Sequence, residues 1–211
     1  MKLYSYYRSS CSYRVRIALH HKNLPFEYMP VHLVKDGGEQ LTEGYSKLNP
    51  KKEVPTLVDK NITLAQSTAI FLYLDRMYID TPLFPKELPF FEKCLELVEI
   101  INSGTQPIQN LKVLKKLKSD FNISDDQKTD WVRYFIKQGL EAYQAKLTPG
   151  SKFSLGDEVT AADMFLVPQL YNAHRFNVDM SSLKHLLEIE KNCLELGAFK
   201  KAHPSTQPDA E

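Results

Sequence analysis

The sequence lacks the features that define several large classes of protein. Its 3 cysteines, Cys11, Cys94 and Cys193, are widely separated in 211 residues, form no C-x-x-C pair and do not group with histidine at metal-ligand spacing. An odd, scattered set favours reduced thiols in a reducing compartment over a disulfide framework, and we expect no metal site. No apolar run approaches the length of a membrane span, and the N-terminus has no secretory signal. We therefore predict a cytoplasmic protein without a membrane partner.

The chain also lacks a large excess of positive or negative charge. The formal net charge is +1, which gives no electrostatic reason to propose nucleic acid or an anionic membrane as a partner. With 43% hydrophobic and 25% charged residues, the composition is that of an ordinary globular protein. The chain is long enough for one large domain or two modest ones.

Two halves of the chain follow different periodicities. Residues 1–78 alternate strand-like and helix-like patterns in the order β-α-β, β-β-α, as in a small α/β domain with a mixed sheet. Three prolines interrupt residues 79–90, which predicts a linker. Helical spacing of apolar residues then predicts helices over 90–118, 125–147, 160–174 and 182–201, followed by a loosely held polar tail. Within the third helix pattern, Thr160 and Asp163 resemble a capping box.

The first strand–helix joint carries a cluster of small nucleophilic side chains, Ser9, Ser10 and Cys11. Free N–H groups and the helix dipole favour an anion there, so the joint can hold another molecule's thiolate or lower the pKa of its own cysteine. Serine is also a leading N-cap residue, and on these residues alone simple capping is the favoured interpretation.

Two further stretches bear on this choice. In "EVPTL", Pro55 begins a strand, either as an ordinary strand-initiating proline or in a cis bond, and Val54 can pair its backbone with an extended peptide ligand. In "AQSTAI", Gln66 and Ser67 open a helix whose N-terminus can be capped by the serine or can bind a carboxylate.

Together these stretches resemble the glutathione transferase superfamily, and "SSCSYRVRIAL" is similar to the signature of its zeta class. The resemblance continues through "LNPKKEVPTL", "AQSTAI", "TQPIQNL", "GDEVTAADMFLVPQ", "NAHRFNVD" and "HPSTQPD", and so covers essentially the whole chain. It implies an α/β thioredoxin-like N-terminal domain (1–80) that binds glutathione, a linker (81–89) and an all-α C-terminal domain (90–211) that binds substrate. It also implies a homodimer, for which apolar helix positions at Leu95, Val98 and Ile101 are available.

The resemblance implies a function as well: glutathione-dependent cis–trans isomerisation of maleylacetoacetate, or a close maleyl diketo acid, in tyrosine and phenylalanine degradation. Ser9 would hold the glutathione thiolate, with Ser10 and Cys11 tuning the site. The other residues implied to bind glutathione are Gln40, Val54, Pro55, Gln66, Ser67, Gln106 and Asn110. An acidic small-molecule substrate needs cations, for which Arg8 and Arg175 are the candidates; a salt bridge is an almost equally good interpretation of Arg175.

Several alternatives remain open at this point. The chain can be a general zeta-class transferase acting on α-halo acids, an isomerase of maleylpyruvate, a thiol transferase that uses Cys11, or a glutathione-fold binding protein without turnover. Arg14 and Arg16 lie on the helix that follows the joint; we expect one to pair with an acid and the other to be solvated.

Overall fold

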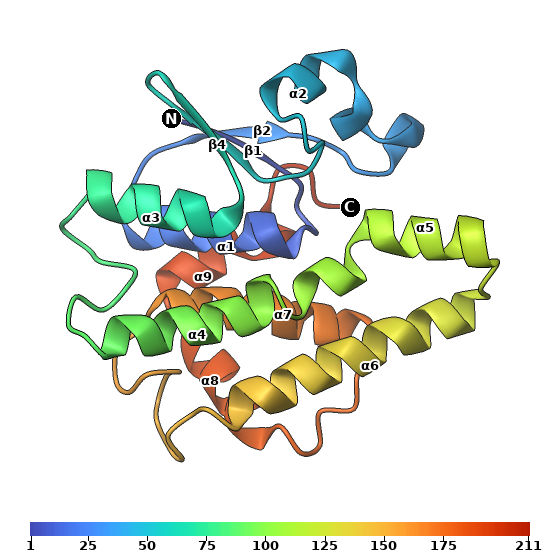
Figure 1. Ribbon diagram of the computed structural model, residues 1–211. Coiled ribbons are helices and arrows are strands. Elements are labelled where there is room, and N and C mark those ends of the chain that lie inside the picture. Colours follow the sequence, from blue (N-terminus) through green and yellow to red (C-terminus); the bar gives the residue numbers. More distant parts are fainter. The chain divides into compact units, whose positions relative to one another are not determined.

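The computed structural model describes residues 1–211, and internal contacts divide the chain into two units (Figure 1). The first unit comprises Met1–Leu83 and Leu194–Glu211, and the second comprises Phe84–Cys193. This division differs from the predicted boundaries at the C-terminus, because residues 194–211 group with the N-terminal unit and not with the helical one.

The first unit is built on a mixed four-stranded sheet, as the sequence predicts, in the order β2-β1-β3-β4. β1 and β2 pair in parallel, whereas β1 with β3 and β3 with β4 are antiparallel. The elements are β1 (Lys2–Ser5), α1 (Ser10–His21), β2 (Glu27–Pro30), two short 3-10 turns, α2 (Glu43–Leu48), β3 (Thr56–Asp59), β4 (Ile62–Ala65), α3 (Ser67–Met77) and, from the end of the chain, α9 (Gly197–Ala202) with a short 3-10 turn (Pro204–Thr206).

Helix α1 lies at the centre of this unit. It packs against both α3 and α9, so Val15, Ile17 and Leu19 are fully buried although they point in different directions around the helix. A helix enclosed on several sides loses the simple apolar stripe of a surface helix. This is why α1 contains only one half-buried residue, Cys11, before His20.

The second unit is entirely helical (Figure 1). It contains α4 (Phe90–Asn102), a 3-10 turn (Gln106–Gln109), α5 (Leu111–Phe121), α6 (Asp125–Gln144), α7 (Ala161–Arg175) and α8 (Lys184–Leu194), with α4 packed against α6 and α7. The continuous helix predicted over 90–118 is wrong. The chain breaks after Asn102, where Gly104 and Pro107 disfavour a regular helix and Asn110 caps the next one. The helix predicted over 182–201 is likewise divided into α8 and α9.

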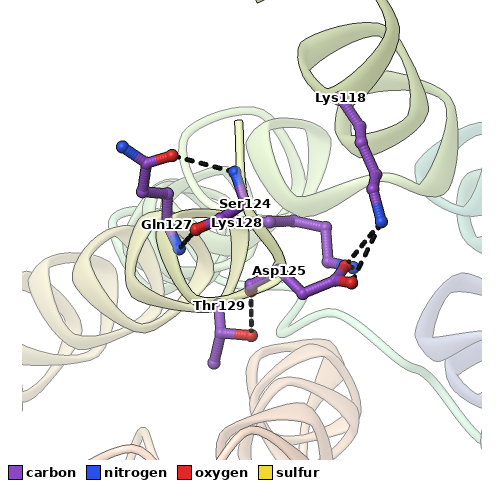
Figure 2. A network of polar contacts seen from close by, with 6 residues as sticks. All are labelled: Lys118, Ser124, Asp125, Gln127, Lys128 and Thr129. Atoms are coloured by element: carbon purple, nitrogen blue, oxygen red, sulfur yellow. Dashed lines mark hydrogen bonds and ion pairs between the residues drawn. The ribbon is translucent and has the colours of Figure 1, made fainter. Parts of the chain in front are cut away.

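Reciprocal side-chain bonds fix where two of these helices begin. Figure 2 shows the capping box of α6, in which the Ser124 hydroxyl accepts from the Gln127 N–H at 3.1 Å and Gln127 Oε1 accepts from the Ser124 N–H at 2.8 Å. Next to it, hydrogen bonds from Lys128 and then Lys118 lower the pKa of Asp125 to about 2. At the start of α7, the Asp163 carboxylate accepts from the Thr160 N–H at 2.9 Å, and the predicted capping box is confirmed.

Two other sequence predictions are wrong. Val98 and Ile101 are fully buried within the helical unit, and so they are not available as a dimer surface. The polar tail is not loosely held, because the Asp209 carboxylate accepts hydrogen bonds from the Tyr7 N–H and the Tyr28 hydroxyl. None of the helices combines the length and the apolar character that crossing a bilayer requires.

Candidate functional site

The joint between β1 and α1 places Ser9 at the helix N-cap. Its backbone is extended, with φ −71° and ψ 116°, and its hydroxyl accepts a hydrogen bond from the Ser12 N–H at 3.2 Å. The Ser9 N–H in turn donates to the Tyr6 carbonyl at 3.0 Å. Ser10, the first helical residue, is buried, whereas Cys11 is half-buried and its thiol is free. Of the three candidate side chains, the Ser9 hydroxyl is therefore the one fixed by the helix end itself.

Arg8 lies against two aromatic rings directly before this joint. Its guanidinium donates to the Tyr6 hydroxyl at 3.1 Å, and its central carbon lies 5.8 Å from the Tyr6 ring centroid and 5.5 Å from that of Tyr7. Such stacking holds a guanidinium without neutralising its charge. Burial raises the pKa of Tyr6 and outweighs the opposing effect of Arg8. Arg8 thus remains a half-buried cation beside Ser9.

The two arginines that follow the joint are both fully buried, so the expectation that one is solvated is wrong. Arg14 donates to the Ser67 hydroxyl at 3.1 Å. Arg16 donates to the carbonyls of Tyr7 at 2.9 Å and Ala202 at 3.0 Å, among other partners. A buried guanidinium must have such partners, because its desolvation is costly.

The segment before β3 carries the predicted peptide-binding backbone. The Val54–Pro55 bond is cis. Val54 precedes the sheet ladder, whose last pair on this side joins Tyr4 and Thr56, so its backbone does not pair with β1. Nearby in the sequence, Gln40 is buried and its Oε1 has no hydrogen-bond partner, while its Nε2 donates to the Leu33 carbonyl at 3.3 Å.

The start of α3 combines an unusual backbone with a buried hydroxyl. Gln66 has φ 74° and ψ 116°, a backbone conformation that residues other than glycine rarely adopt, and its side chain is exposed. Such strain is concentrated at ligand-binding positions. Ser67 follows as the first helical residue and is buried against Arg14. A helix N-terminus with a buried cation behind it is suited to a carboxylate.

Strand register explains why these separate segments meet. β3 runs antiparallel to β1, so its first residue, Thr56, pairs with Tyr4 near the C-terminal end of β1. The same Thr56 pairs with Ala65, the last residue of β4. The segments with Ser9, Val54 and Ser67 therefore adjoin the same edge of the sheet, although they lie far apart in the sequence.

In the helical unit, Gln106 and Asn110 are not on the first helix, where they were expected. Gln106 begins the 3-10 turn, and the Asn110 side chain caps α5 by accepting from the Lys112 N–H at 3.1 Å. Both side chains are half-buried. The break between α4 and α5 is what places them in a connecting segment.

Arg175, the last residue of α7, is held by a chain of amides that the sequence did not reveal. Its guanidinium donates to Asn172 Oδ1 at 3.3 Å, Asn172 Nδ2 donates to Gln109 Oε1 at 3.4 Å, and Gln109 Nε2 donates to Gln169 Oε1 at 2.7 Å. The three amide side chains are buried. The signal was present, since positions 169, 172 and 175 recur every three residues and share one face of a helix.

No group of three or more histidine, cysteine or acidic side chains is arranged to hold a metal ion. What the geometry offers is a helix-capping hydroxyl, unused backbone and a helix N-terminus at one sheet edge. These groups suit a peptide-like molecule with a carboxylate, and the Ser9 hydroxyl can donate to an anionic group such as a thiolate.

Comparison with known proteins gives a consistent result. Residues 1–76 match the model of the glutathione S-transferase N-terminal domain. A maleylacetoacetate isomerase of Dictyostelium discoideum is 43% identical over 212 residues, which cover 99% of this chain and 95% of that protein.

Two solved structures extend the comparison. A maleylpyruvate isomerase, described as a bacterial zeta-class glutathione S-transferase, superposes with a TM-score of 0.96 at 36% identity, over 100% of both chains. A maleylacetoacetate isomerase from Anaeromyxobacter dehalogenans, with dicarboxyethyl glutathione and citrate in its active site, has a TM-score of 0.86 at 38% identity, over 100% of this chain and 93% of that one. The predicted fold is thereby confirmed, and the chain belongs to the zeta class of the glutathione transferases.

Proposed function

We propose that this chain catalyses the glutathione-dependent cis–trans isomerisation of maleylacetoacetate, or a close maleyl diketo acid, to the fumaryl form, a step in tyrosine and phenylalanine degradation. The observation that carries the proposal is the Ser9 hydroxyl, which accepts from the Ser12 N–H at 3.2 Å at the start of α1. A hydroxyl has one proton to donate and two lone pairs that accept. Capping the helix uses a lone pair of Ser9, and its proton can be donated to a thiolate.

The energetics are adequate for this role. A free thiol has a pKa of about 8.5, and each unit by which this pKa falls corresponds to about 1.4 kcal/mol of preference for the thiolate. A hydrogen bond to a charged group contributes about 1.5–3 kcal/mol, and a helix N-terminus adds about 0.3–1 kcal/mol. Ser9 at the N-cap of α1 is therefore enough to make a bound thiolate the major form near neutral pH, with Ser10 and Cys11 as its neighbours.

The residues of the first unit also fit the rest of glutathione. Val54, before the cis-Pro55, offers its backbone to the cysteinyl part, and Gln66 and Ser67 offer a helix N-terminus to the γ-glutamyl carboxylate. The buried Gln40 Oε1, which has no partner, can accept an N–H from the glycyl end. We assign the half-buried Gln106 and Asn110 to polar contacts as well.

Substrate binding is assigned to Arg8 and Arg175. Arginine binds carboxylates bidentately, and Arg8 is oriented by the Tyr6 hydroxyl while Arg175 is oriented by Asn172. When bound, glutathione supplies the nucleophilic sulfur, whose addition to the activated double bond lets that bond rotate before elimination. The chain's own residues hold the thiolate, fix the substrate carboxylates and determine which carbon is attacked.

Three other activities are alternatives to this proposal. A thiol transferase would use Cys11, but Cys11 lies within the first turn of α1 and Ser9 occupies the capping position. Maleylpyruvate and α-halo acids are also acidic, and the same arginines would bind them. A direct comparison of turnover with each of these acids is needed to choose among them.

The setting of the activity is part of the proposal. We expect a cytoplasmic enzyme, as its free cysteines suggest, and a homodimer. Its exposed apolar side chains include Met77 and Ile79 in the first unit and Leu88 and Phe90 in the second.

The decisive experiment mixes the purified protein with glutathione and maleylacetone and follows the loss of cis-enone absorbance, with maleylpyruvate and a halo acid run in parallel. We expect isomerisation of the maleyl compounds that depends on glutathione. Binding of glutathione without isomerisation would overturn the proposal. Arg175→Ala should weaken the binding of acidic substrates far more than the binding of an uncharged electrophile.

A further inference from the structure

The C-terminal segment reaches back to the backbone that leads into the Ser9 joint. Asp209 Oδ2 accepts from the Tyr7 N–H at 3.0 Å, across 202 positions of sequence, and Asp209 Oδ1 accepts from the Tyr28 hydroxyl at 2.6 Å. None of these groups belongs to the residues assigned above to glutathione or substrate.

Arg16 binds the same stretch of backbone through the carbonyl groups of Tyr6 and Tyr7. Its Nη1 donates to the Tyr6 carbonyl at 3.3 Å and its Nη2 donates to the Tyr7 carbonyl at 2.9 Å. The N–H and C=O of a trans peptide point in opposite directions. The peptide between Tyr6 and Tyr7 is therefore fixed at its C=O by Arg16 and at its N–H by Asp209, which prevents it from rotating.

This restraint is transmitted directly to Ser9. The Tyr6 carbonyl that Arg16 holds is also the acceptor of the Ser9 N–H, at 3.0 Å. Arg16 Nε further donates to the Ala202 carbonyl at 3.0 Å, which ties the end of α9 to the same guanidinium. Ser9, Arg16 and the C-terminal segment thus form one hydrogen-bonded unit.

The segment that leads to Asp209 is itself ordered by internal hydrogen bonds. Gln207 Nε2 donates to the carbonyls of Lys201 and His203, each at 2.9 Å.

We propose that Asp209, together with Arg16, is a positioning residue for the thiolate-holding serine, so that residues 203–211 are required for thiolate stabilisation and not only for folding. This inference rests on the proposed function, in which Ser9 donates to the glutathione thiolate. A displacement of about 1 Å at a reacting group reduces rates by about 10²-fold, so a modest relaxation of this backbone has a measurable effect.

The test measures the pKa of the glutathione thiol bound to the enzyme, by its ultraviolet thiolate absorbance, together with kcat and KM. Wild type is titrated first, because a bound thiol with the pKa of free glutathione would reject the proposed function itself. Asp209→Ala and Asp209→Asn are then compared, with Glu211→Gln as the matched control. Glu211 lies in the same tail and bonds to His32, whose ring packs on the Tyr6 ring, but it makes no hydrogen bond to the peptide between Tyr6 and Tyr7.

The two Asp209 variants separate position from charge. Both remove a negative charge, which alone would lower the thiol pKa equally in the two, but only Asn keeps an oxygen that can accept from the Tyr7 N–H. We expect Asp209→Ala to raise the thiol pKa by about one unit and to lower kcat/KM about tenfold, with Asp209→Asn and Glu211→Gln close to wild type. Equal thiol pKa values in the Ala and Asn variants would overturn the inference.

A milder variant keeps the test decisive if Asp209→Ala does not fold. Tyr28→Phe removes one of the two contacts of the carboxylate without changing its charge or touching Tyr7. We expect a smaller rise of the thiol pKa and a loss in kcat of about two- to threefold at unchanged substrate KM. A Tyr28→Phe enzyme with lower thermal stability but wild-type thiol pKa and kcat would show that the tail is merely structural.

Discussion

Ser9 has two roles in this structure, and replacing it in two different ways separates them. Its hydroxyl caps α1 by accepting from the Ser12 N–H, and it is the proposed donor to the glutathione thiolate. Replacing a capping serine with alanine costs about 1 kcal/mol of stability, whereas replacing it with glycine costs only a few tenths. Ser9→Ala and Ser9→Gly should therefore differ in stability by about 0.5–1 kcal/mol.

The two variants should not differ, by contrast, in their effect on the pKa of the bound thiol. Neither alanine nor glycine can donate a hydrogen bond, so both variants should raise the pKa of bound glutathione by about one unit, equivalent to about 1.4 kcal/mol. If the wild-type thiol titrates near pH 7, the thiolate fraction at that pH falls from about a half to about a tenth. Ser9→Thr keeps both the cap and the hydroxyl and serves as the control.

The assays are urea unfolding for stability, thiolate absorbance for the pKa and maleylacetone isomerisation for turnover. We expect the glycine variant to be nearly as stable as wild type and as impaired in catalysis as the alanine variant. If activity followed stability instead, with Ser9→Gly close to wild type, the hydroxyl would be only a helix cap. Cys11→Ala should retain most of its activity, and a dead Cys11→Ala enzyme would favour the thiol-transferase interpretation.

The parts of this fold that could be predicted from sequence are those that depend on local periodicity. The strand and helix order of the first unit follows from alternation and helical spacing, and the α7 capping box follows from Thr160 and Asp163. The helix break near Gly104 was missed, because apolar spacing continues across it in Leu111 and Leu114 and conceals the change of direction. Periodicity reports which face is apolar, but it does not report where the axis turns.

Long-range polar contacts are the part that sequence could not supply. Of Arg14 and Arg16, one was expected to pair with an acid and the other to be solvated, yet both are buried. The partners of Arg16 include the carbonyl of Ala202, 186 positions away, and backbone carbonyls have no sequence signature. The candidate thiol site, by contrast, was visible because Ser9, Ser10 and Cys11 fall in one short window next to a helix start. The amide chain behind Arg175 combines both cases. Gln169 and Asn172 share a face of α7 that the sequence spacing predicts, whereas their partner Gln109 is distant in the sequence and could not be predicted.

Three further predictions address packing, charge and substrate binding. Gly139→Ala should destabilise the protein by about 1–3 kcal/mol in urea unfolding, although alanine favours helix by about 1 kcal/mol, because the new methyl group would overlap the buried Thr105 side chain. The Tyr78 hydroxyl, at 2.6 Å, is the main cause of the lowered pKa of Asp59, so Tyr78→Phe should cost about 1 kcal/mol of stability at pH 7. This difference should be fully present above the usual carboxyl value of 3.8 and should shrink as the pH falls through the lower pKa of Asp59 in the folded protein. Asn172→Ala removes an acceptor of Arg175, the arginine proposed to bind the substrate, so KM should rise about three- to tenfold for an acidic substrate and remain unchanged for a neutral electrophile. Equal losses for both substrates would mean that the buried amides support the helix and not the arginine.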